Sequence, residues 1–572
     1  MTYDIVIVGG SLGGCAAAIA ASGGSFSVCV LETSAWLGGQ YSAQGVTRPD
    51  DSQYTASVGS TAAYRAFQQD VRNYYRANFK LSPAGAAQTA FNPGGAGGGF
   101  ATSPSVAHQI LLQHLQSPNV HVRLNVRVTA ATVQDTTIQS VTILDGDGVE
   151  TVVAAKYFLD ATDLGDLLVL AGVEYTLGAE ARSETLEPNA PAVARPDWIQ
   201  PITVVAALER RPEGETHTIA EPNDYQALKA QQKFAIQSGY VKTMFLPPTD
   251  LWGYRRYIAA ANFSDPALPY DLSMLNMGAN DYQAATIPTG DAAKDAAIVE
   301  AAHQATLAYV YWLQTEAPRD DGKGNGYPNL RLCPDEFATP DGAAPQPYIR
   351  ESRRINAQYT IVQQDVDRSL NPGPRAKNYD DSCGIGFYGA LDIHALGGAG
   401  MGEQWIAINP FEIPLRSLIP IRVTNLLPAC KNIGTTHITN GAYRLHPVEW
   451  CVGEAAGTLA LDALTNGVAP NQYPSDGAKL RRYQQRLLRR GAPIFWWTDV
   501  HFGDAWFAAA HLMGVAGIMT GTDSTMNFNP AEPFPAGDQA AVNEKIGQSL
   551  DWPSGSVTRG TTAEWLVGQL GW

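Results

Sequence analysis

The first forty residues constrain the fold of this chain most. The apolar run Tyr3–Val8 leads into the turn Gly9-Gly10-Ser11-Leu12-Gly13-Gly14, an alanine-rich segment follows, and a second apolar run ends at Glu32. This order predicts a βαβ unit. Backbone N–H groups in such a turn can approach a pyrophosphate, and the helix N-terminus adds partial positive charge. Glu32 lies 18 residues after Gly14, at the distance where a carboxylate meets a ribose diol and repels a 2′-phosphate. We therefore predict a dinucleotide site.

Ser11 departs from the usual fingerprint, which has glycine at this position. Serine is small enough to be accommodated, but the departure makes the motif less specific. The alternative is a glycine-rich turn in an ordinary α/β domain. The position of the turn between a strand and a helix, with an acid closing the second strand, favours the dinucleotide site.

Composition restricts the class of protein. The 572 residues predict two or three domains, and the formal net charge of −16 disfavours a nucleic-acid partner. The six cysteines form no Cys-x-x-Cys pair, so we expect buried thiols and no metal site. No basic segment precedes residue 3, and the uncharged run Ala505–Thr522 contains His511 and three glycines. We expect a cytoplasmic protein that has no membrane partner.

Periodicity predicts three regions. Residues 1–171 and 419–466 form a discontinuous dinucleotide-binding domain, 172–418 an inserted α+β substrate domain, and 467–572 a C-terminal helical region. The predicted helices are Thr61–Asn78, Ser105–Gln116, Leu167–Ala171, Tyr225–Ser238, Ala292–Glu316 and Val448–Asn466. The predicted strands after the βαβ unit are Val120–Val128, Thr137–Leu144, Glu150–Ala155, Tyr157–Asp160 and part of 419–428. Pro93–Gly99 is predicted to be a flexible loop.

Two later motifs extend the pattern. The first, Asp160-Ala161-Thr162-Asp163-x-Gly165-Asp166, is a second turn from a strand into a helix. The second runs from Gly434 through Arg444 and Pro447 to Gly457 and places the start of a helix deep in the C-terminal half. Together with Leu37-Gly38-Gly39 and the run 348–355, these motifs resemble the FAD-dependent oxidoreductases of the glutathione-reductase-2 fold, near the succinate dehydrogenase flavoproteins. The resemblance covers most of residues 1–466.

This resemblance implies a Rossmann-like FAD-binding domain with a parallel central sheet, and a role for each matching residue. The pyrophosphate would lie at Gly9, Gly10, Ser11, Gly13 and Gly14, and against Ala161, Thr162 and Gly165. Glu32 would hold the ribose, Val128 the adenine, and Gly38, Gly39 and Gln40 the ribityl chain and flavin edge. Gly434 and Pro447 belong to the block whose helix would point its N-terminus at flavin N1 and O2. Gln40-Tyr41 stands where some relatives carry a histidine linked to flavin, which implies non-covalent FAD.

Candidate catalytic residues flank the flavin-proximal turn in sequence. A base must take a proton from the substrate in flavin-dependent dehydrogenation, and His437 and His446 are the first candidates; a structural role in the turn is the alternative. Arg350, Arg353 and Arg354 would bind a carboxylate substrate or form interdomain ion pairs, including one with Glu351. Arg444 would neutralise flavin or substrate, or hold its loop. Six aromatic residues would form a pocket over the flavin or belong to the core: Trp252, Tyr254, Tyr257, Tyr282, Phe387 and Tyr388.

The leading hypothesis is an FAD-dependent oxidoreductase. It would transfer a hydride between flavin N5 and a small organic substrate, for which a carboxylate would explain the arginines; the electron acceptor is open. A flavin monooxygenase is the second hypothesis, which NADPH consumption coupled to oxygen insertion would support. The third is a flavin-binding assembly or surface-attached protein, because Val557–Leu566 resembles part of an S-layer-homology module.

Overall fold

The fold is built around a seven-stranded sheet, seen here in a computed structural model that describes residues 1–95, 99–237, 239, 241–394, 396, 404–521, 524–553, 555 and 557–572. Its strands follow the order β3-β2-β1-β6-β5-β4, and β17 also pairs with β6. Strands β3, β2, β1, β6 and β17 are parallel, so their carboxyl ends meet at one edge. Their bounds are β1 (Thr2–Val8), β2 (Val28–Leu31), β3 (Val120–Arg123), β4 (Val126–Gln134), β5 (Thr137–Asp145), β6 (Glu150–Asp160) and β17 (Leu426–Pro428).

Strand β6 joins two parts of the chain that are far apart in sequence. Its first half pairs with antiparallel β5, and its last residues pair with parallel β17 on the other side of the insertion. The sequence divided β6 into two strands, which was wrong: it runs unbroken through Lys156. The sequence also joined β3 to β4, and the structure separates them at Asn125, which adopts a left-handed φ of 56°. Only Leu426–Pro428 of the stretch 419–428 is a strand.

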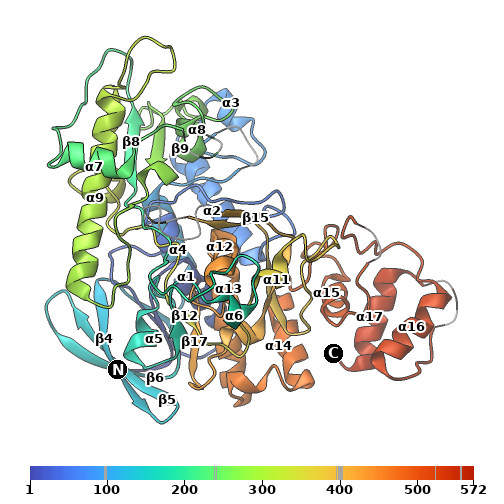
Figure 1. Ribbon diagram of the computed structural model, residues 1–572. Coiled ribbons are helices and arrows are strands. Elements are labelled where there is room, and N and C mark those ends of the chain that lie inside the picture. Colours follow the sequence, from blue (N-terminus) through green and yellow to red (C-terminus); the bar gives the residue numbers. More distant parts are fainter. Residues whose placement is uncertain are drawn as a thin grey trace.

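Helices α1 (Leu12–Ala21) and α13 (His446–Asn466) pack against each other in the middle of the molecule (Figure 1). Eighteen of the 21 residues of α13 are buried. Their contact surface is made of small residues, and Gly453 and Gly457 lie directly against the backbone of Gly13 and Ala17. The C-terminal half of the chain therefore completes the unit that the first forty residues begin.

The insertion between β6 and β17 contains a second sheet, with the order β11-β8-β10-β9, and the long helix α9 (Figure 1, top left). This arrangement agrees with a discontinuous domain, while the domain boundaries remain predictions. The insertion and its flanks hold these elements: α5 (Asp166–Leu170), β7 (Tyr175–Thr176), α6 (Arg182–Thr185), β8 (Ala206–Arg210), α7 (Tyr225–Gln232), α8 (Leu251–Arg255), β9 (Arg256–Ile258), β10 (Leu272–Leu275), α9 (Ala292–Thr315), β11 (Leu330–Leu332), α10 (Pro334–Phe337), β12 (Arg354–Ile355), α11 (Gln363–Val366), β13 (Ser382–Gly386), β14 (Ala390–Ile393), β15 (Gln404–Ala407) and β16 (Phe411–Pro414).

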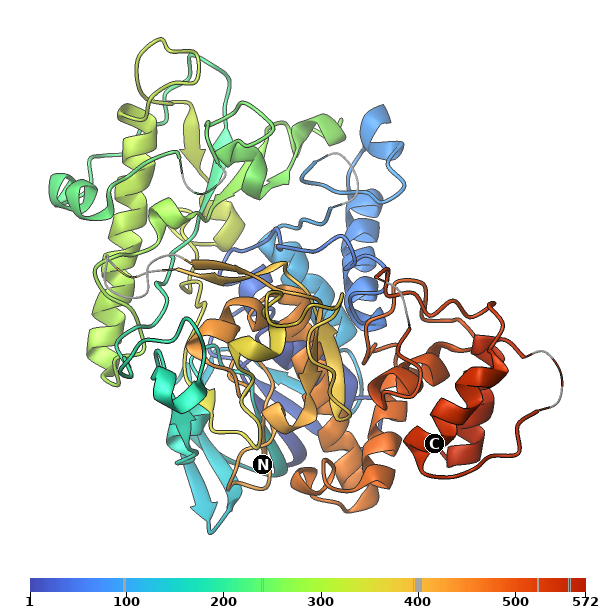
Figure 2. The same ribbon diagram turned by 45° about the vertical axis from the view of Figure 1, so that its right-hand side comes forward.

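Helices α15 (Phe507–Val515), α16 (Ala536–Ile546) and α17 (Arg559–Leu570) stand to one side of the molecule (Figure 2). The run 505–522 was expected to be a buried helix, and its helical part is α15; residue 522 lies outside the described residues. The tail that resembles an S-layer-homology module is α17, capped by Thr558 and packed on α15. The remaining helices are α2 (Ala62–Asn78), α3 (Pro83–Ala86), α4 (Pro104–His114), α12 (His437–Tyr443) and α14 (Gly477–Arg489).

One predicted helix is shorter in the structure than the sequence indicated. The predicted helix Tyr225–Ser238 ends at Gln232, because Lys233 turns left-handed with a φ of 53°; residue 238 lies outside the described residues. So does part of the predicted loop Pro93–Gly99. The six cysteines, all in the described part of the chain, are buried free thiols. Within the described ranges, no helix combines the length and apolar character needed to cross a membrane.

Candidate active site

A cavity of about 320 Å³ lies at the carboxyl edge of the parallel sheet. We call it the dinucleotide cavity. Seven residues predicted to bind the cofactor line it: Gly9, Ser11, Glu32, Gly39, Val128, Ala161 and Thr162. Helix α9 of the insertion closes part of it with Asp295, Ala296 and Val299. The cavity thus lies where an open α/β sheet is expected to bind its ligand.

Ser11 acts as the N-cap of α1. Its Oγ accepts a hydrogen bond of 3.2 Å from the N–H of Gly14, which explains why serine can replace the fingerprint glycine. The N–H groups of Ser11 and Leu12 have no hydrogen-bond partner among the residues that the structure describes. Two donors at the start of a ten-residue helix therefore remain available for an anion.

The glycines of the turn are required by close backbone packing. Gly9 has a φ of 101°, and a Cβ there would lie 2.3 Å from the carbonyl oxygen of Ala161. A Cβ at Gly14 would lie 2.1 Å from the carbonyl oxygen of Gly9. Side chains at these positions would force β1, α1 and β6 apart.

Glu32 is held rigidly at the end of β2. Its Oε2 accepts a hydrogen bond of 2.7 Å from the N–H of Gly10, and its Oε1 accepts one of 2.7 Å from the N–H of Ser34. The carboxylate is buried yet lines the cavity, as a ribose-binding acid must. The glycine turn, the two available donors and this acid fit the adenosine and pyrophosphate of FAD.

The other predicted cofactor residues do not belong to the lining of the dinucleotide cavity. Gly10, Gly13 and Gly14 pack the turn, while Gly38 and Gly165 adopt left-handed φ values of 107° and 64°. Gln40 is fully buried and donates to the carbonyl of Arg444 over 3.1 Å. Two more of these residues, Gly434, packed on Ala357 and Tyr359, and Pro447, in the first turn of α13, likewise do not belong to the lining.

A second cavity, of about 670 Å³, lies between the sheet domain and the insertion. We call it the catalytic cavity. The extended segment 346–350 separates it from the dinucleotide cavity. Gln346, Pro347 and Ile349 line the dinucleotide cavity, whereas Tyr348 and Arg350 line the catalytic cavity. From Pro347 to Arg350 the side chains alternate between the two cavities, as extended backbone requires, and an isolated bridge between Tyr348 and Thr203 fixes this register.

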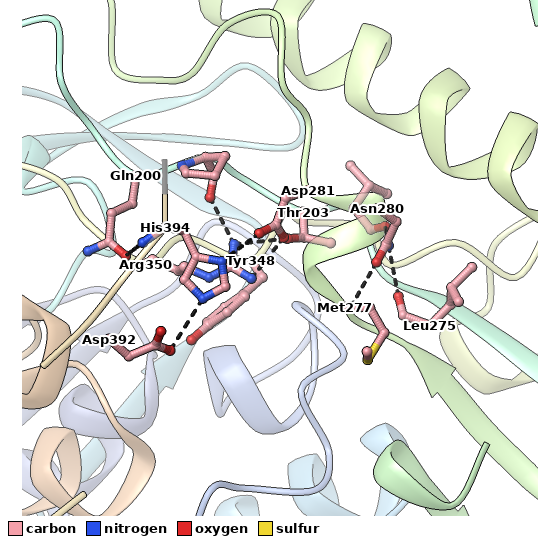
Figure 3. Close-up of polar contacts among 12 residues, drawn as sticks. Gln200, Thr203, Leu275, Met277, Asn280, Asp281, Tyr348, Arg350, Asp392 and His394 are labelled. Atoms are coloured by element: carbon pink, nitrogen blue, oxygen red, sulfur yellow. Dashed lines mark hydrogen bonds and ion pairs between the residues drawn. The ribbon is translucent and has the colours of Figure 1, made fainter. Parts of the chain in front are cut away.

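His394 lies at the centre of a charged cluster in the catalytic cavity (Figure 3). Its Nδ1 is 2.8 Å from Asp281 Oδ2, and its Nε2 is 3.3 Å from Asp392 Oδ2. Each of these acids also binds an arginine: Arg350 contacts Asp281 over 2.8 Å, and Arg444 contacts Asp392 over 3.1 Å. We call these five residues the His394 cluster.

The cluster stabilises the protonated form of His394. Burial and the Arg350 charge lower the pKa of His394, but the hydrogen bonds to Asp281 and Asp392 outweigh them and raise it above its usual value. Burial raises the pKa of Asp392 and of Asp281, yet their cationic neighbours hold both below the usual range. A neutral imidazole would turn a lone pair toward one of the two carboxylates, so both ring nitrogens carry protons.

Two other acids line the catalytic cavity. Asp50 is held by Arg255 through bonds of 3.0 and 3.1 Å, so the two charges cancel. Asp51 accepts hydrogen bonds from Tyr64 and Gln68, and burial raises its pKa to about 6.

Only some of the predicted catalytic residues lie at the catalytic cavity. Arg350 and Arg444 line the catalytic cavity. His437, His446 and Arg354 do not belong to the lining of either cavity. His437 Nδ1 contacts Glu351 over 2.8 Å, and His446 Nε2 is 2.9 Å from the carbonyl oxygen of Val46.

The three arginines that lie close together in sequence, Arg350, Arg353 and Arg354, also have different surroundings in the structure. Arg354 is fully buried between Glu180 and Glu351, which is the ion pairing that the sequence left open. Arg353 contacts Asp166 over 3.4 Å. Only Arg350 reaches the catalytic cavity. Of the six aromatic candidates, Tyr254 and Tyr388 line this cavity. Trp252, Tyr257 and Tyr282 belong to hydrophobic cores, and Phe387 packs against another core.

Sequence reasoning missed His394, Asp392 and Asp281. The only local signal was Asp392-Ile-His394, an acid near the end of a short strand and a histidine directly after it. Asp281 comes from a turn more than a hundred residues earlier, so its contact with His394 is a product of the tertiary fold.

Comparison with known proteins identifies the class. Residues 4–487 match the family described as FAD dependent oxidoreductase, and the chain belongs to this family. Its cofactor is therefore FAD, and it is an oxidoreductase. A comparison with curated proteins gives no match.

Solved structures share only parts of the fold. L-proline dehydrogenase from P. horikoshii is 15% identical over 31% of this chain and 24% of its own, with a TM-score of 0.18. The 3-ketosteroid-delta4-(5alpha)-dehydrogenase from Rhodococcus jostii RHA1 is 16% identical over 29% and 48%, with a TM-score of 0.19. The p-nitrophenol 4-monooxygenase PnpA from Pseudomonas putida DLL-E4 is 12% identical over 63% and 70%, with a TM-score of 0.28. The chain thus spans less than half the length of the two dehydrogenases.

Proposed function

We propose that the chain transfers a hydride between FAD and a small, carboxylate-bearing substrate in the catalytic cavity, with His394 as the proton-transfer residue. The observation that carries this proposal is the position of His394, which lines the cavity between two carboxylates and beside two arginines. FAD would supply the hydride acceptor or donor, held by the residues of the dinucleotide cavity.

The charge of the His394 cluster favours an anionic substrate. The cluster has three cationic side chains, His394, Arg350 and Arg444, and two carboxylates, Asp281 and Asp392. One positive charge is left in excess, and a substrate carboxylate would neutralise it. Arginine also matches the planar geometry of a carboxylate.

The two contacts of His394 differ in length, and this decides which proton can move. The Nδ1 contact with Asp281 is 2.8 Å long, and Asp281 is almost fully buried. The Nε2 contact with Asp392 is 3.3 Å long, and Asp392 lines the cavity. The proton at Nε2 is therefore the more weakly held, and Asp281 orients the ring that delivers or receives it.

The test is an anaerobic screen of FAD-loaded protein. Small carboxylic acids and their methyl esters are added in turn, and the absorbance of oxidised flavin is followed. We expect some acids to bleach the flavin and their esters to fail. In H394N the flavin spectrum should persist while the bleaching rate falls by about 10²–10⁴, the usual contribution of a general acid or base.

His303→Asn is the matched control, since His303 pairs with Asp341 outside both cavities and should retain the wild-type rate. Bleaching by esters as fast as by acids would refute the carboxylate assignment. An undiminished rate in H394N would refute the role of His394.

A further inference from the structure

A buried charge network lies beside the start of α1. Lys431, only 3% exposed, forms ion pairs with Asp163 and with Glu449, the latter over 3.5 Å. Asp163 lines the dinucleotide cavity and accepts a hydrogen bond of 2.6 Å from Gln44. We call Asp163, Lys431 and Glu449 the charge network.

Glu449 lies at the start of two helices at once. It belongs to the first turn of α13, and its Oε1 accepts a hydrogen bond of 3.0 Å from the N–H of Gly13 in the first turn of α1. Gln40 donates to its other oxygen. A carboxylate at these positions interacts with the partial positive charge of both helix ends. Glu449 therefore occupies the electrostatic environment that an anionic cofactor needs.

Two carboxylates of the network face one ammonium group. Burial raises the pKa of Asp163, so Glu449 is the more firmly ionised of the two acids. Although burial alone would raise it, the pKa of Glu449 is held below its usual value by the Lys431 charge, and that of Lys431 is raised by both acids, so both groups are charged at neutral pH. Glu32 adds a further carboxylate to the lining of the dinucleotide cavity. A pyrophosphate at the N–H groups of Ser11 and Leu12 would lie next to the N–H of Gly13, which the charged Glu449 carboxylate already occupies.

We propose that Glu449 competes with bound FAD for two helix N-termini, that of α1, where the pyrophosphate would lie, and that of α13, where the flavin edge would lie. Lys431 limits this competition, so that the chain holds FAD in exchangeable form. This rests on the proposed binding of FAD in the dinucleotide cavity. Glu449 is a positioning residue for the cofactor, because it acts through charge and through Gly13.

The experiment measures the affinity of apoprotein for FAD in wild type, E449Q, K431Q and the double variant, by titration with flavin fluorescence. E449Q removes the charge and keeps an oxygen for the N–H of Gly13. Gln40, whose Oε1 has no partner among the described residues, can rotate to accept from the new amide. Circular dichroism melts confirm that each apoprotein is folded.

We expect E449Q to lower the Kd for FAD about tenfold or more, as one unit charge at a few ångströms allows even at high effective dielectric. K431Q should raise the Kd by a similar factor, and the double variant should return toward wild type. The midpoint potential of bound FAD should be more positive in E449Q, because reduced flavin is anionic; a purely packing role would not produce this shift.

Glu454→Gln is the matched control. Glu454 is buried on the same helix, one and a half turns further on, and contacts Trp450 and Arg490 instead of the turn Gly9–Gly14. The Kd of the E454Q variant for FAD should stay within twofold of the wild-type value. An E449Q protein that binds FAD no more tightly than wild type would overturn the inference while leaving the proposed function intact. Failure of wild type and every variant to bind FAD would overturn both.

Discussion

Replacing Gly453 by alanine should destabilise the chain even though alanine is the better helix former. Gly453 lies within α13, and a Cβ there would be 2.0 Å from the carbonyl oxygen of Gly13 and 2.6 Å from its carbonyl carbon. These are backbone atoms, so no rotamer change can relieve the contact. The two helices must separate by about 1 Å to restore an ordinary distance.

Two opposing effects decide the magnitude. Alanine in a helix interior gains about 1 kcal/mol over glycine. Overpacking a close contact costs about 1–3 kcal/mol, and helix separation also loses dispersion contacts along the buried interface. We therefore expect a net loss of about 1–2 kcal/mol in the free energy of unfolding. FAD binding should weaken as well, because Gly13 belongs to the glycine turn that would hold the pyrophosphate.

The assay is urea unfolding of the apoprotein, followed by circular dichroism, together with FAD titration. Gly568→Ala provides the control: Gly568 lies in α17, and a Cβ there would meet open space. It should be neutral or stabilising by up to about 1 kcal/mol. An unfolding midpoint for G453A equal to or above that of wild type would refute the packing argument.

Two buried histidines should affect stability in opposite directions with pH. Burial lowers the pKa of His446 to about 4, so only the unfolded chain binds a proton between about pH 6.5 and 4, and stability falls with falling pH by about 3 kcal/mol in total. The stability advantage of wild type over H446Q in urea titrations at pH 7.5 and 4.5 should shrink accordingly; an unchanged advantage would contradict the burial effect. The pKa of His394 is raised in the folded chain. Its protonation therefore stabilises the folded chain fully below about pH 6.5, and this stabilisation is lost as pH rises through the folded-state pKa. The stability difference between wild type and H394N should therefore be largest at pH 6 and decrease toward pH 9. An increase over that range would refute the assignment of His394 as a cation.

The cofactor end of the site could be predicted because its signals are local. The turn from Gly9 to Gly14 and the acid Glu32 specify strand, turn, helix and carboxylate within one βαβ unit. The cap role of Ser11 follows the same local chemistry, since serine is a favoured N-cap residue. The family match over residues 4–487 confirms the cofactor that these residues indicated.

The catalytic end could not be predicted in the same way. His437 was favoured for its place in the chain, but its side chain turns to Glu351, away from the lining of the catalytic cavity. His394 gains its charge from Asp281 and Asp392, and Asp281 is distant in sequence and meets it only in the folded chain. Periodicity reports which face of an element is buried, but it contains no information about which elements share a cavity.

The segment 346–350 connects the two ends of the site. Its backbone is fixed by hydrogen bonds between Tyr348 and Thr203 in both directions, of 2.7 and 3.3 Å. Because side chains alternate along it, Ile349 faces the dinucleotide cavity while Arg350 reaches the catalytic cavity. The Arg350 guanidinium then binds Asp281, which orients His394. One extended segment thus positions the wall of the cofactor site and the first ion pair of the His394 cluster, so the register of this segment determines the geometry of both.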